Sequence, residues 1–259
     1  MKESHPVVHI VGAGPGDPEL LTLKGRRLLE EADLVLYAGS LVNPRLLACC
    51  GPEARKVDSA PLSLEAQVDL LAEAALKGLR VVRLHTGDPS LYGAIGEQIR
   101  PLRERGVEVR LVPGVSSLQA AAAALGVEYT VPGGTQTLVC TRAPGRTPVP
   151  EAESLRVLAA TGATLAVFLS AEHAPAVVAS CLEAGLAPDT PAAWVYRASW
   201  PDQRVGRTTL EHLAASLEEA GIRRHALLVI GRCLDPGDVR SLLYHPSFAH
   251  GHRPAEDPR

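Results

Sequence analysis

The stretch VVHIVGAGPGD, residues 7–17, is a short apolar run that ends in a glycine-rich turn. A run of this length before such a turn predicts a buried strand over residues 7–11. Charged residues then lie on one side of a predicted helix over residues 23–32, and the apolar residues 34–37 predict a second strand. This order of strand, helix and strand predicts the basic unit of an α/β fold.

The same alternation continues through the first half of the chain. We predict helices over residues 64–77, 91–104 and 116–125, with strands over residues 80–84 and 107–112 between them. Asp88 and Pro89 fit the N-cap and first position of the helix over 91–104. Gly93 and Gly96 disfavour the interior of that helix, so we expect another part of the chain to pack closely there. Alternating strands and helices predict a mostly parallel sheet whose loops gather at the carboxyl ends of its strands.

The composition changes near residue 127, where two segments rich in proline and glycine, VEYTVPGG and RAPGRTPVP, enclose a further predicted strand. We therefore expect two α/β domains, an N-terminal one over residues 1–113 and a C-terminal one over residues 114–259 with an irregular tail from Pro236. The second domain has predicted strands over residues 135–141, 165–169, 192–196 and 227–230, and predicted helices over residues 153–160, 174–184 and 210–220.

The composition excludes several classes of function. The net charge of −3 does not suggest a nucleic acid partner, and the five cysteines form no C-x-x-C pair that would indicate a zinc site. The chain has no apolar run long enough for a membrane span or a signal peptide. We expect a soluble cytoplasmic protein with no nucleic acid or membrane partner. His245, His250 and His252 lie close together, but we interpret them as solvated or packing residues and predict no metal site.

Three predicted loops carry the functional signal: GAGPGD (12–17), TGDP (86–89) and PGVSS (113–117). Glycines let a backbone approach a ligand closely, so three such turns at one sheet edge predict a small-molecule site. The spacing G-x-G-x-G is not the dinucleotide fingerprint, and Asp17 would repel a pyrophosphate. The carboxylate of Asp88 suits a cofactor with a sulfonium and an ammonium group better. No hydrolase motif is present.

Four blocks, VHIVGAGPGDPELLTLKG, ADLVLYAGSLV, RVVRLHTGDPSLYGAIGEQ and VPGVSSLQAAAAALG, resemble the tetrapyrrole methylase family in order and spacing. The resemblance continues through LAVFLS, AAWVYRASWPDQRVGRTTLEHL and HALLVIG, so it covers residues 7–235. The block YAGSLV and the tail RSLLYHPSFAHGHR are similar to members that methylate precorrin-4 or cobalt-precorrin-4. The resemblance implies C-methylation of ring carbon 11 of such a tetrapyrrole in cobalamin biosynthesis.

The family resemblance also implies a homodimer with S-adenosylmethionine in a cleft between the two domains. The positions that match cofactor contacts of the family are Pro15, Thr86, Gly87, Asp88, Leu91, Ser116, Ser117, Ser170, Ala198 and Ala226. We further expect the acidic arms of the substrate to meet Arg142, Arg146 or Arg197. Related uroporphyrinogen methyltransferases carry an Asp and a Lys for proton transfer, where this chain has Ala38-Gly39-Ser40 and Asp58-Ser59-Ala60. We therefore assign no general base.

Three alternatives remain open at the level of sequence. The chain could be another methylase of the same family, such as a different corrin-ring methylase or a diphthine synthase, which product identification would separate. It could be a cofactor-binding module without catalysis, which would bind ligand and release no homocysteine-containing product. A NAD-dependent oxidoreductase is the third, and the absence of an acidic residue after the strand over 34–37 argues against it.

Overall fold

The computed structural model of the chain describes residues 5–238, 241, 247–249 and 251–253. The chain divides into two compact units. The first comprises Met1–Ala120 together with the short segment Arg197–Asp202, and the second comprises Ala121–Tyr196 and Gln203–Arg259. His245 and His250 of the histidine-rich tail lie outside the described residues.

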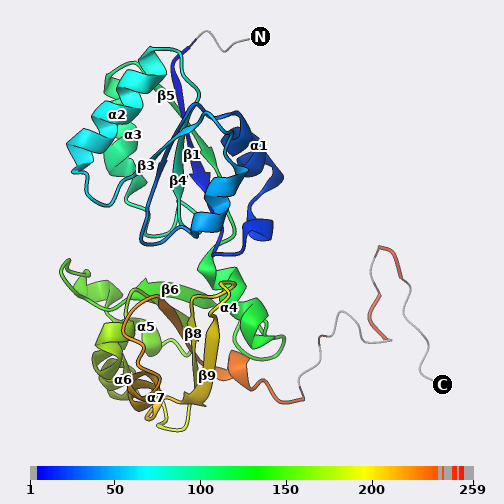
Figure 1. The fold of residues 1–259 in the computed structure, drawn as a ribbon. Coiled ribbons are helices and arrows are strands. Elements are labelled where there is room, and N and C mark those ends of the chain that lie inside the picture. The colour runs from blue at the N-terminus through cyan, green and yellow to red at the C-terminus, as the bar shows by residue number, and fades with distance from the viewer. Residues whose placement is uncertain (1–4, 239–240, 242–246, 250, 254–259) are drawn as a thin grey trace. The chain divides into compact units, whose positions relative to one another are not determined.

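The first unit contains a parallel sheet of five strands in the order β3-β2-β4-β1-β5 (Figure 1). Every neighbouring pair in it runs parallel, which confirms the predicted sheet. The strand β3 was not predicted, because its sequence RKVD is charged and lies at the sheet edge, where it has no apolar run to reveal it. The strands are β1 (Val7–Gly12), β2 (Leu34–Tyr37), β3 (Arg55–Asp58), β4 (Val81–His85) and β5 (Glu108–Val112).

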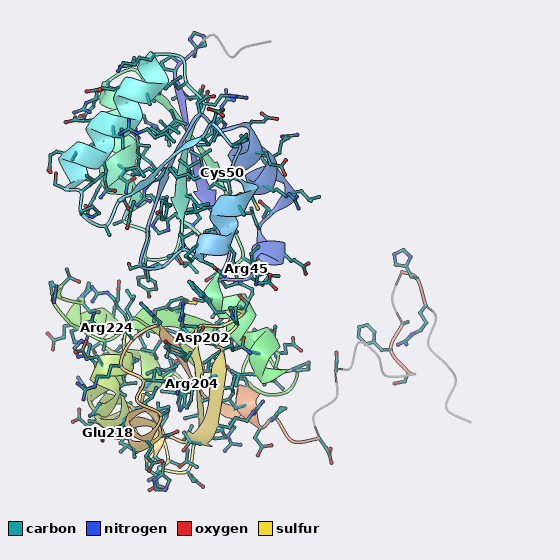
Figure 2. All side chains as sticks on the ribbon, viewed as in Figure 1. Arg45, Cys50, Asp202, Arg204, Glu218 and Arg224 are labelled. Atoms are coloured by element: carbon teal, nitrogen blue, oxygen red, sulfur yellow. The ribbon has the colours of Figure 1, made fainter. Side chains whose placement is uncertain are left out.

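Helices cover both faces of this sheet (Figure 1). The helices α2 (Leu64–Leu76) and α3 (Ile95–Glu104) pack on the face that contains Leu36 and Val81. The helix α1 (Leu23–Glu31) and the 3-10 helix η2 (Pro44–Cys49) pack on the face that contains Val35 and Leu84. Cys50, labelled in Figure 2, is a buried member of this second apolar layer. The two apolar layers hold the strands and fix the positions of the loops that follow them.

The predicted helix over residues 91–104 is wrong at its start, because α3 begins only at Ile95. Asp88 does not cap it. The backbone at Tyr92 and Ala94 is left-handed, with φ of 55° and 48°, which interrupts a right-handed helix. The prediction of close packing is confirmed at Gly93, where an added Cβ would collide with the carbonyl oxygen of Pro89, and is wrong at Gly96, where such an atom meets nothing within 4 Å.

The second unit contains a mixed sheet in the order β6-β7-β10-β8-β9. The strands β6 and β7 are parallel, whereas β10 is antiparallel to both β7 and β8, and β8 is antiparallel to β9. The carboxyl ends of β6, β7 and β8 therefore lie at the same edge as the amino end of β10. The strands are β6 (Leu138–Arg142), β7 (Thr164–Phe168), β8 (Pro191–Tyr196), β9 (Arg204–Thr209) and β10 (Ala226–Ile230).

The remaining elements are short. The strand β9 was not predicted because its sequence RVGRTT is mostly polar and exposed at the sheet edge; its first residue, Arg204, is labelled in Figure 2. No helix in the described part of the chain is long and apolar enough to cross a bilayer. The helices are α4 (Ser117–Leu125), α5 (Leu155–Ala159), α6 (Ala174–Glu183) and α7 (Leu213–Glu219), and the remaining 3-10 helices are η1 (Pro18–Leu20), η3 (Glu151–Glu153), η4 (Ala171–His173) and η5 (Arg232–Leu234).

Candidate functional site

The loops that follow β1 and β4 are joined by backbone hydrogen bonds. The amide of Ala13 donates to the carbonyl of His85 at 2.6 Å. Gly14 and Gly87 exchange two bonds, of 3.2 Å from the amide of Gly14 and 2.9 Å from the amide of Gly87, and form an isolated bridge beyond the sheet. Two of the three loops predicted to form a site therefore lie side by side.

The third loop, after β5, packs against the first two through glycines. An added Cβ on Gly12 would lie 2.6 Å from the Cα of Gly114 and 2.7 Å from the carbonyl oxygen of Gly87. Real Cβ atoms do not tolerate such contacts, so positions 12 and 114 accept only glycine in this arrangement. At these two positions the three loops therefore meet backbone against backbone.

Asp88 ties the second loop to the third. Its Oδ2 accepts a 2.9 Å hydrogen bond from the amide of Gly114, and its Oδ1 accepts bonds from the amide and the hydroxyl of Ser90. Partial burial raises the pKa of Asp88, but the bonds from Ser90 and Gly114 outweigh this effect and lower the pKa below its ordinary value. The carboxylate is therefore ionised at neutral pH, and it lies at the edge where the three loops meet.

The other predicted residues of these loops cap a helix or lie close to a neighbouring loop. Ser116 is buried, and its Oγ accepts a 3.2 Å bond from the amide of Leu118, which is the ordinary behaviour of a helix N-cap. An added Cβ on Gly87 would lie 3.8 Å from the Cα of Ser116 and 3.9 Å from the amide nitrogen of Ser117. The hydroxyl of Thr86 donates to the carbonyl of Leu41 at 3.2 Å, which joins the loop after β2 to the same edge.

A fourth segment, Arg197–Asp202, belongs to the same unit although it follows β8 in the chain. The indole of Trp200 donates to the carbonyl of Pro15 at 2.8 Å, and the hydroxyl of Ser199 accepts a 3.0 Å bond from the amide of Asp17. An added Cβ on Gly16 would collide with the ring of Trp200. The buried Ala198, a predicted cofactor residue, is thereby held in the same unit as Pro15.

Backbone strain coincides with the predicted cofactor positions. Left-handed backbone costs a residue with a side chain about 1–2 kcal/mol. Such strain gathers at functional sites, where the surrounding structure enforces it. Within the described ranges, six non-glycine residues have this conformation, and each lies within three residues of a predicted cofactor position: Tyr92, Ala94, Leu169, Arg197, Ser199 and His225.

In the second unit, the predicted residues Ser170 and Ala226 lie at the carboxyl end of β7 and the amino end of β10. Ser170 is fully buried, and its hydroxyl donates to the carbonyl of Phe168 at 2.6 Å and accepts a 2.8 Å bond from the amide of Ala143. Its neighbour Leu169 is 70% exposed with φ of 54°. Sequence reasoning missed Leu169, because neither its exposure nor its strain leaves a signal in the sequence.

Two of the three predicted substrate arginines make local contacts. The guanidinium group of Arg142 donates to the carbonyls of Ala143, Thr147 and Pro148, which holds the loop after β6. Arg197 pairs with Asp202 at 2.6 Å, and its guanidinium carbon lies 3.9 Å from the centre of the Trp200 ring.

Asp202 is labelled in Figure 2. Arg146 is exposed on the loop that Arg142 holds.

The described residues contain no group of three or more side chains that could hold a metal ion.

Asp58 and Gly39 form an unexpected pair at the same edge of the first sheet. The Oδ1 of Asp58 accepts 2.9 Å bonds from the amides of Gly39 and Ala60. An added Cβ on Gly39 would collide with the Asp58 carboxylate. The carboxylate from β3 thus fills the space that a side chain at position 39 would take. Sequence reasoning did not place Asp58 at this edge, because it did not predict β3.

The family model described as Tetrapyrrole (Corrin/Porphyrin) Methylases matches residues 7–214. The chain is 48% identical to a cobalt-precorrin-4 C(11)-methyltransferase of Methanocaldococcus jannaschii over 247 residues, which cover 95% of each protein.

Two solved structures are similar as well. A cobalamin biosynthetic enzyme, cobalt precorrin-4 methyltransferase, is 47% identical with a TM-score of 0.88, covering 90% of this chain and 98% of the other. A uroporphyrin-III C-methyltransferase from Thermus thermophilus, solved with bound S-adenosylhomocysteine, is 35% identical with a TM-score of 0.74, covering 90% and 95%.

Proposed function

The chain belongs to the tetrapyrrole methylase family, and from this premise we propose that it is an S-adenosylmethionine-dependent methyltransferase of cobalamin biosynthesis. Its substrate is cobalt-precorrin-4 or precorrin-4, and the methyl group is added to ring carbon 11. The observation that carries the proposal is the interlocking of the three glycine-rich loops, in which Gly14 pairs with Gly87 and Gly114 bonds to Asp88.

The residues at this edge fit the cofactor. Gly12 and Gly114 let the backbones of the three loops meet directly, because an added Cβ at either would collide with another loop, and an edge built of backbone amides and carbonyls suits a ligand held by such groups. The ionised Asp88 is a favourable neighbour for a molecule with ammonium and sulfonium groups. In the second unit we assign further contacts to Ala226 and to the backbone of Ser170, whose hydroxyl is already bonded within the protein, and we add Leu169, whose exposure and strain match those of a contact residue.

When bound, S-adenosylmethionine supplies a methyl group on sulfur, ready for attack by a nucleophilic ring carbon. The residues of this chain bind and orient. The loops after β1, β4 and β5 are fixed against one another, so the cofactor meets a rigid surface. Orientation alone corresponds to effective molarities of about 10⁵ M or more, so we assign most of the catalysis to positioning. The ring that accepts the methyl group loses a proton, and we assign no side chain to that step.

We assign recognition of the acidic arms of the substrate to Arg146 first. Arg142 already donates to backbone carbonyls, and Arg197 already pairs with the carboxylate of Asp202. Arg146, in contrast, is exposed on the loop held by Arg142. Arg146→Ala is expected to raise KM for the tetrapyrrole about fivefold to tenfold, since one charged contact is lost, and to leave the Kd for S-adenosylhomocysteine unchanged. An unchanged KM would remove Arg146 from the site.

The decisive experiment is turnover with a defined substrate. The purified protein is incubated with cobalt-precorrin-4, or with precorrin-4, and a ¹³C-labelled methyl donor, and the modified carbon is located by NMR. The expected product carries the label on ring carbon 11, with S-adenosylhomocysteine formed in equal amount. Label on another carbon would identify a different corrin-ring methylase. Cofactor binding without any methylated product would leave a binding module.

We further propose that the enzyme acts in the cytoplasm as a homodimer. The support is the family resemblance, together with a described chain that contains no helix able to span a bilayer. Light scattering on the purified protein tests the assembly, because a dimer doubles the chain mass of 27.3 kDa. A mass equal to that of one chain would reject the homodimer without affecting the proposed reaction.

A further inference from the structure

His85 is the last residue of β4, and it lies directly before the loop that contains Thr86, Gly87 and Asp88. Both of its ring nitrogens face carbonyl oxygens of the segment that follows. Nδ1 lies 3.1 Å from the carbonyl oxygen of Thr86, and Nε2 lies 3.1 Å from the carbonyl oxygen of Gly93. One imidazole ring therefore spans the loop from its first residue to its last turn before α3.

The geometry at Gly93 shows how tightly the ring fits. An added Cβ on Gly93 would lie 3.2 Å from Cε1 of His85 and would collide with the carbonyl oxygen of Pro89. Tyr92 and Ala94, on either side of Gly93, have left-handed backbone. A strained turn of this kind persists only where neighbouring groups enforce it. The ring of His85 is one such group, because it contacts Gly93 in the middle of the turn.

We propose that His85 is the positioning residue of this loop and that the protonation state of its ring controls how well the loop holds the methyl donor. This inference rests on the proposed function, because it assigns the cofactor to the loop. A neutral imidazole has one N–H and can satisfy only one of the two carbonyls, whereas an imidazolium donates to both. The ring therefore holds one end of the loop or both, depending on a single proton.

The charged groups that act on the ring are Arg83, on the same strand, and Asp88, in the loop; the α3 side chain that faces Arg83 is the neutral Gln98. Arg83 is itself 5% exposed, and its guanidinium group bonds to Gln98 and to the carbonyls of Leu36 and Leu84. Its positive charge opposes a second one on His85, and Asp88 favours it.

The balance of these effects decides whether protonation of His85 strengthens or weakens the hold of the loop on the methyl donor. Burial lowers the pKa of His85 below its ordinary value of 6.5; the two carbonyls and Asp88 raise it, and Arg83 lowers it further. The ring is therefore neutral at neutral pH and donates to one of the two carbonyls. Protonation adds the second hydrogen bond but buries a positive charge near Arg83, and the cost of burial is larger, so falling pH weakens this arrangement of the loop. Affinity for the methyl donor is therefore full above pH 6.5, the ordinary pKa of histidine. It is lost as the pH falls from there through the lowered pKa of His85.

The first test uses the unmodified protein with S-adenosylhomocysteine as the probe. Its Kd, measured by calorimetry between about pH 8 and pH 5, is expected to stay constant above about pH 6.5 and to weaken below it by at most tenfold per pH unit, since one proton is involved. By reciprocity, the probe must lower the pKa of the His85 ring, read from its Cε1–H signal in NMR. A pKa unchanged by the probe would overturn the proposal.

Two substitutions distinguish the contact of His85 with Thr86 from its contact with Gly93. A glutamine amide can reach the carbonyl of Gly93 and does not titrate, so His85→Gln is expected to keep Kd within about threefold at pH 8 and to abolish its pH dependence. We assign the single N–H of the neutral ring to Nε2, which faces the carbonyl of Gly93. His85→Asn reaches only the carbonyl of Thr86 and is therefore expected to weaken binding about tenfold at every pH. The matched control is His212→Gln, at an exposed histidine of the second unit, which should keep the wild-type profile.

Other outcomes are equally informative. Equal pH profiles for His85→Gln and the unmodified protein would overturn the proposal, and so would an asparagine variant that binds as well as wild type. Thermal melting of each variant shows whether it is folded, and the NMR titration decides the question if both variants unfold. An unmodified protein that binds no S-adenosylhomocysteine at any pH would instead reject the proposed function, and this inference with it.

Discussion

The edges of the two sheets carry predicted site residues in different ways. In the first unit all strands are parallel, and their carboxyl ends meet in loops whose contacts are made by backbone at Gly12, Gly87 and Gly114. In the second unit the sheet is mixed, and the edge is held by polar side chains such as Ser170 and Arg142. The first edge depends on glycines whose backbones meet directly, with Asp88 as a further tie, whereas the second depends on polar side chains.

This difference determines what a substitution does. At the first edge, one added carbon on Gly12 or Gly114 separates three loops at once, because each of these two glycines lies against the backbone of the other two loops. At the second edge, the loss of the Ser170 hydroxyl removes two local hydrogen bonds, one from the amide of Ala143 and one to the carbonyl of Phe168. We therefore expect coupled losses of stability and cofactor binding in the first unit, and losses of stability alone in the second.

The largest effect is expected for Gly114→Ala. The new Cβ would lie 2.8 Å from the Cα of Gly12, with no flexible side chain able to move away. Overpacking of this kind costs about 1–3 kcal/mol of unfolding free energy, and the displaced loops should lower affinity for S-adenosylhomocysteine at least about tenfold. Denaturant unfolding and calorimetry measure the two quantities.

The matched control for this variant is Gly96→Ala in α3, where an added Cβ meets nothing within 4 Å. An alanine there should raise stability by up to about 1 kcal/mol, because it favours the helix, and should leave binding unchanged. If both variants behave alike, close backbone packing does not define the first edge.

A smaller effect, confined to stability, is expected for Ser170→Ala. The buried amide of Ala143 would lose its acceptor, which costs about 1–3 kcal/mol. Affinity for S-adenosylhomocysteine should stay within about twofold of wild type, because the hydroxyl is already committed to Ala143 and Phe168. A large loss of affinity with little change in unfolding free energy would mean that this hydroxyl contacts the cofactor directly.

The smallest effect on stability is expected for Asp88→Asn. The amide keeps one oxygen acceptor but loses the charge and one of the acceptors that now bond to Gly114 and Ser90. We expect a loss of about 1 kcal/mol in unfolding free energy and about tenfold in affinity for S-adenosylhomocysteine.

The pH dependence of the unmodified protein offers a check on the same residue. The pKa of Asp88 lies below its ordinary value of 3.8, so its charge contributes at every pH above that value. The asparagine variant should therefore lower affinity by a constant factor between about pH 6.5 and pH 8, where His85 is neutral. A loss of affinity that appears only at one end of that range would show that another group carries the charge effect.

Much of the first unit could be predicted from the sequence. Apolar runs and glycine turns gave four of its five parallel strands, and the rule that loops gather at carboxyl ends gave the edge at which Pro15, Thr86 and Ser116 lie. These predictions succeed because local patterns decide them. The edge strands β3 and β9 were missed because exposed edges need no apolar pattern, and with β3 the pairing of Asp58 and Gly39 was missed too.

By itself, the sequence determined the α/β class, the three glycine-rich loops and the family. The tertiary structure decided where the strained residues lie, that Asp88 bonds to Gly114 and caps no helix, that Arg142 and Arg197 hold their own segments, and that His85 faces two carbonyls. The physical reason is range. Propensity and periodicity act over a few neighbouring residues, whereas hydrogen bonds across loops and the burial of a ring depend on groups that only folding brings together.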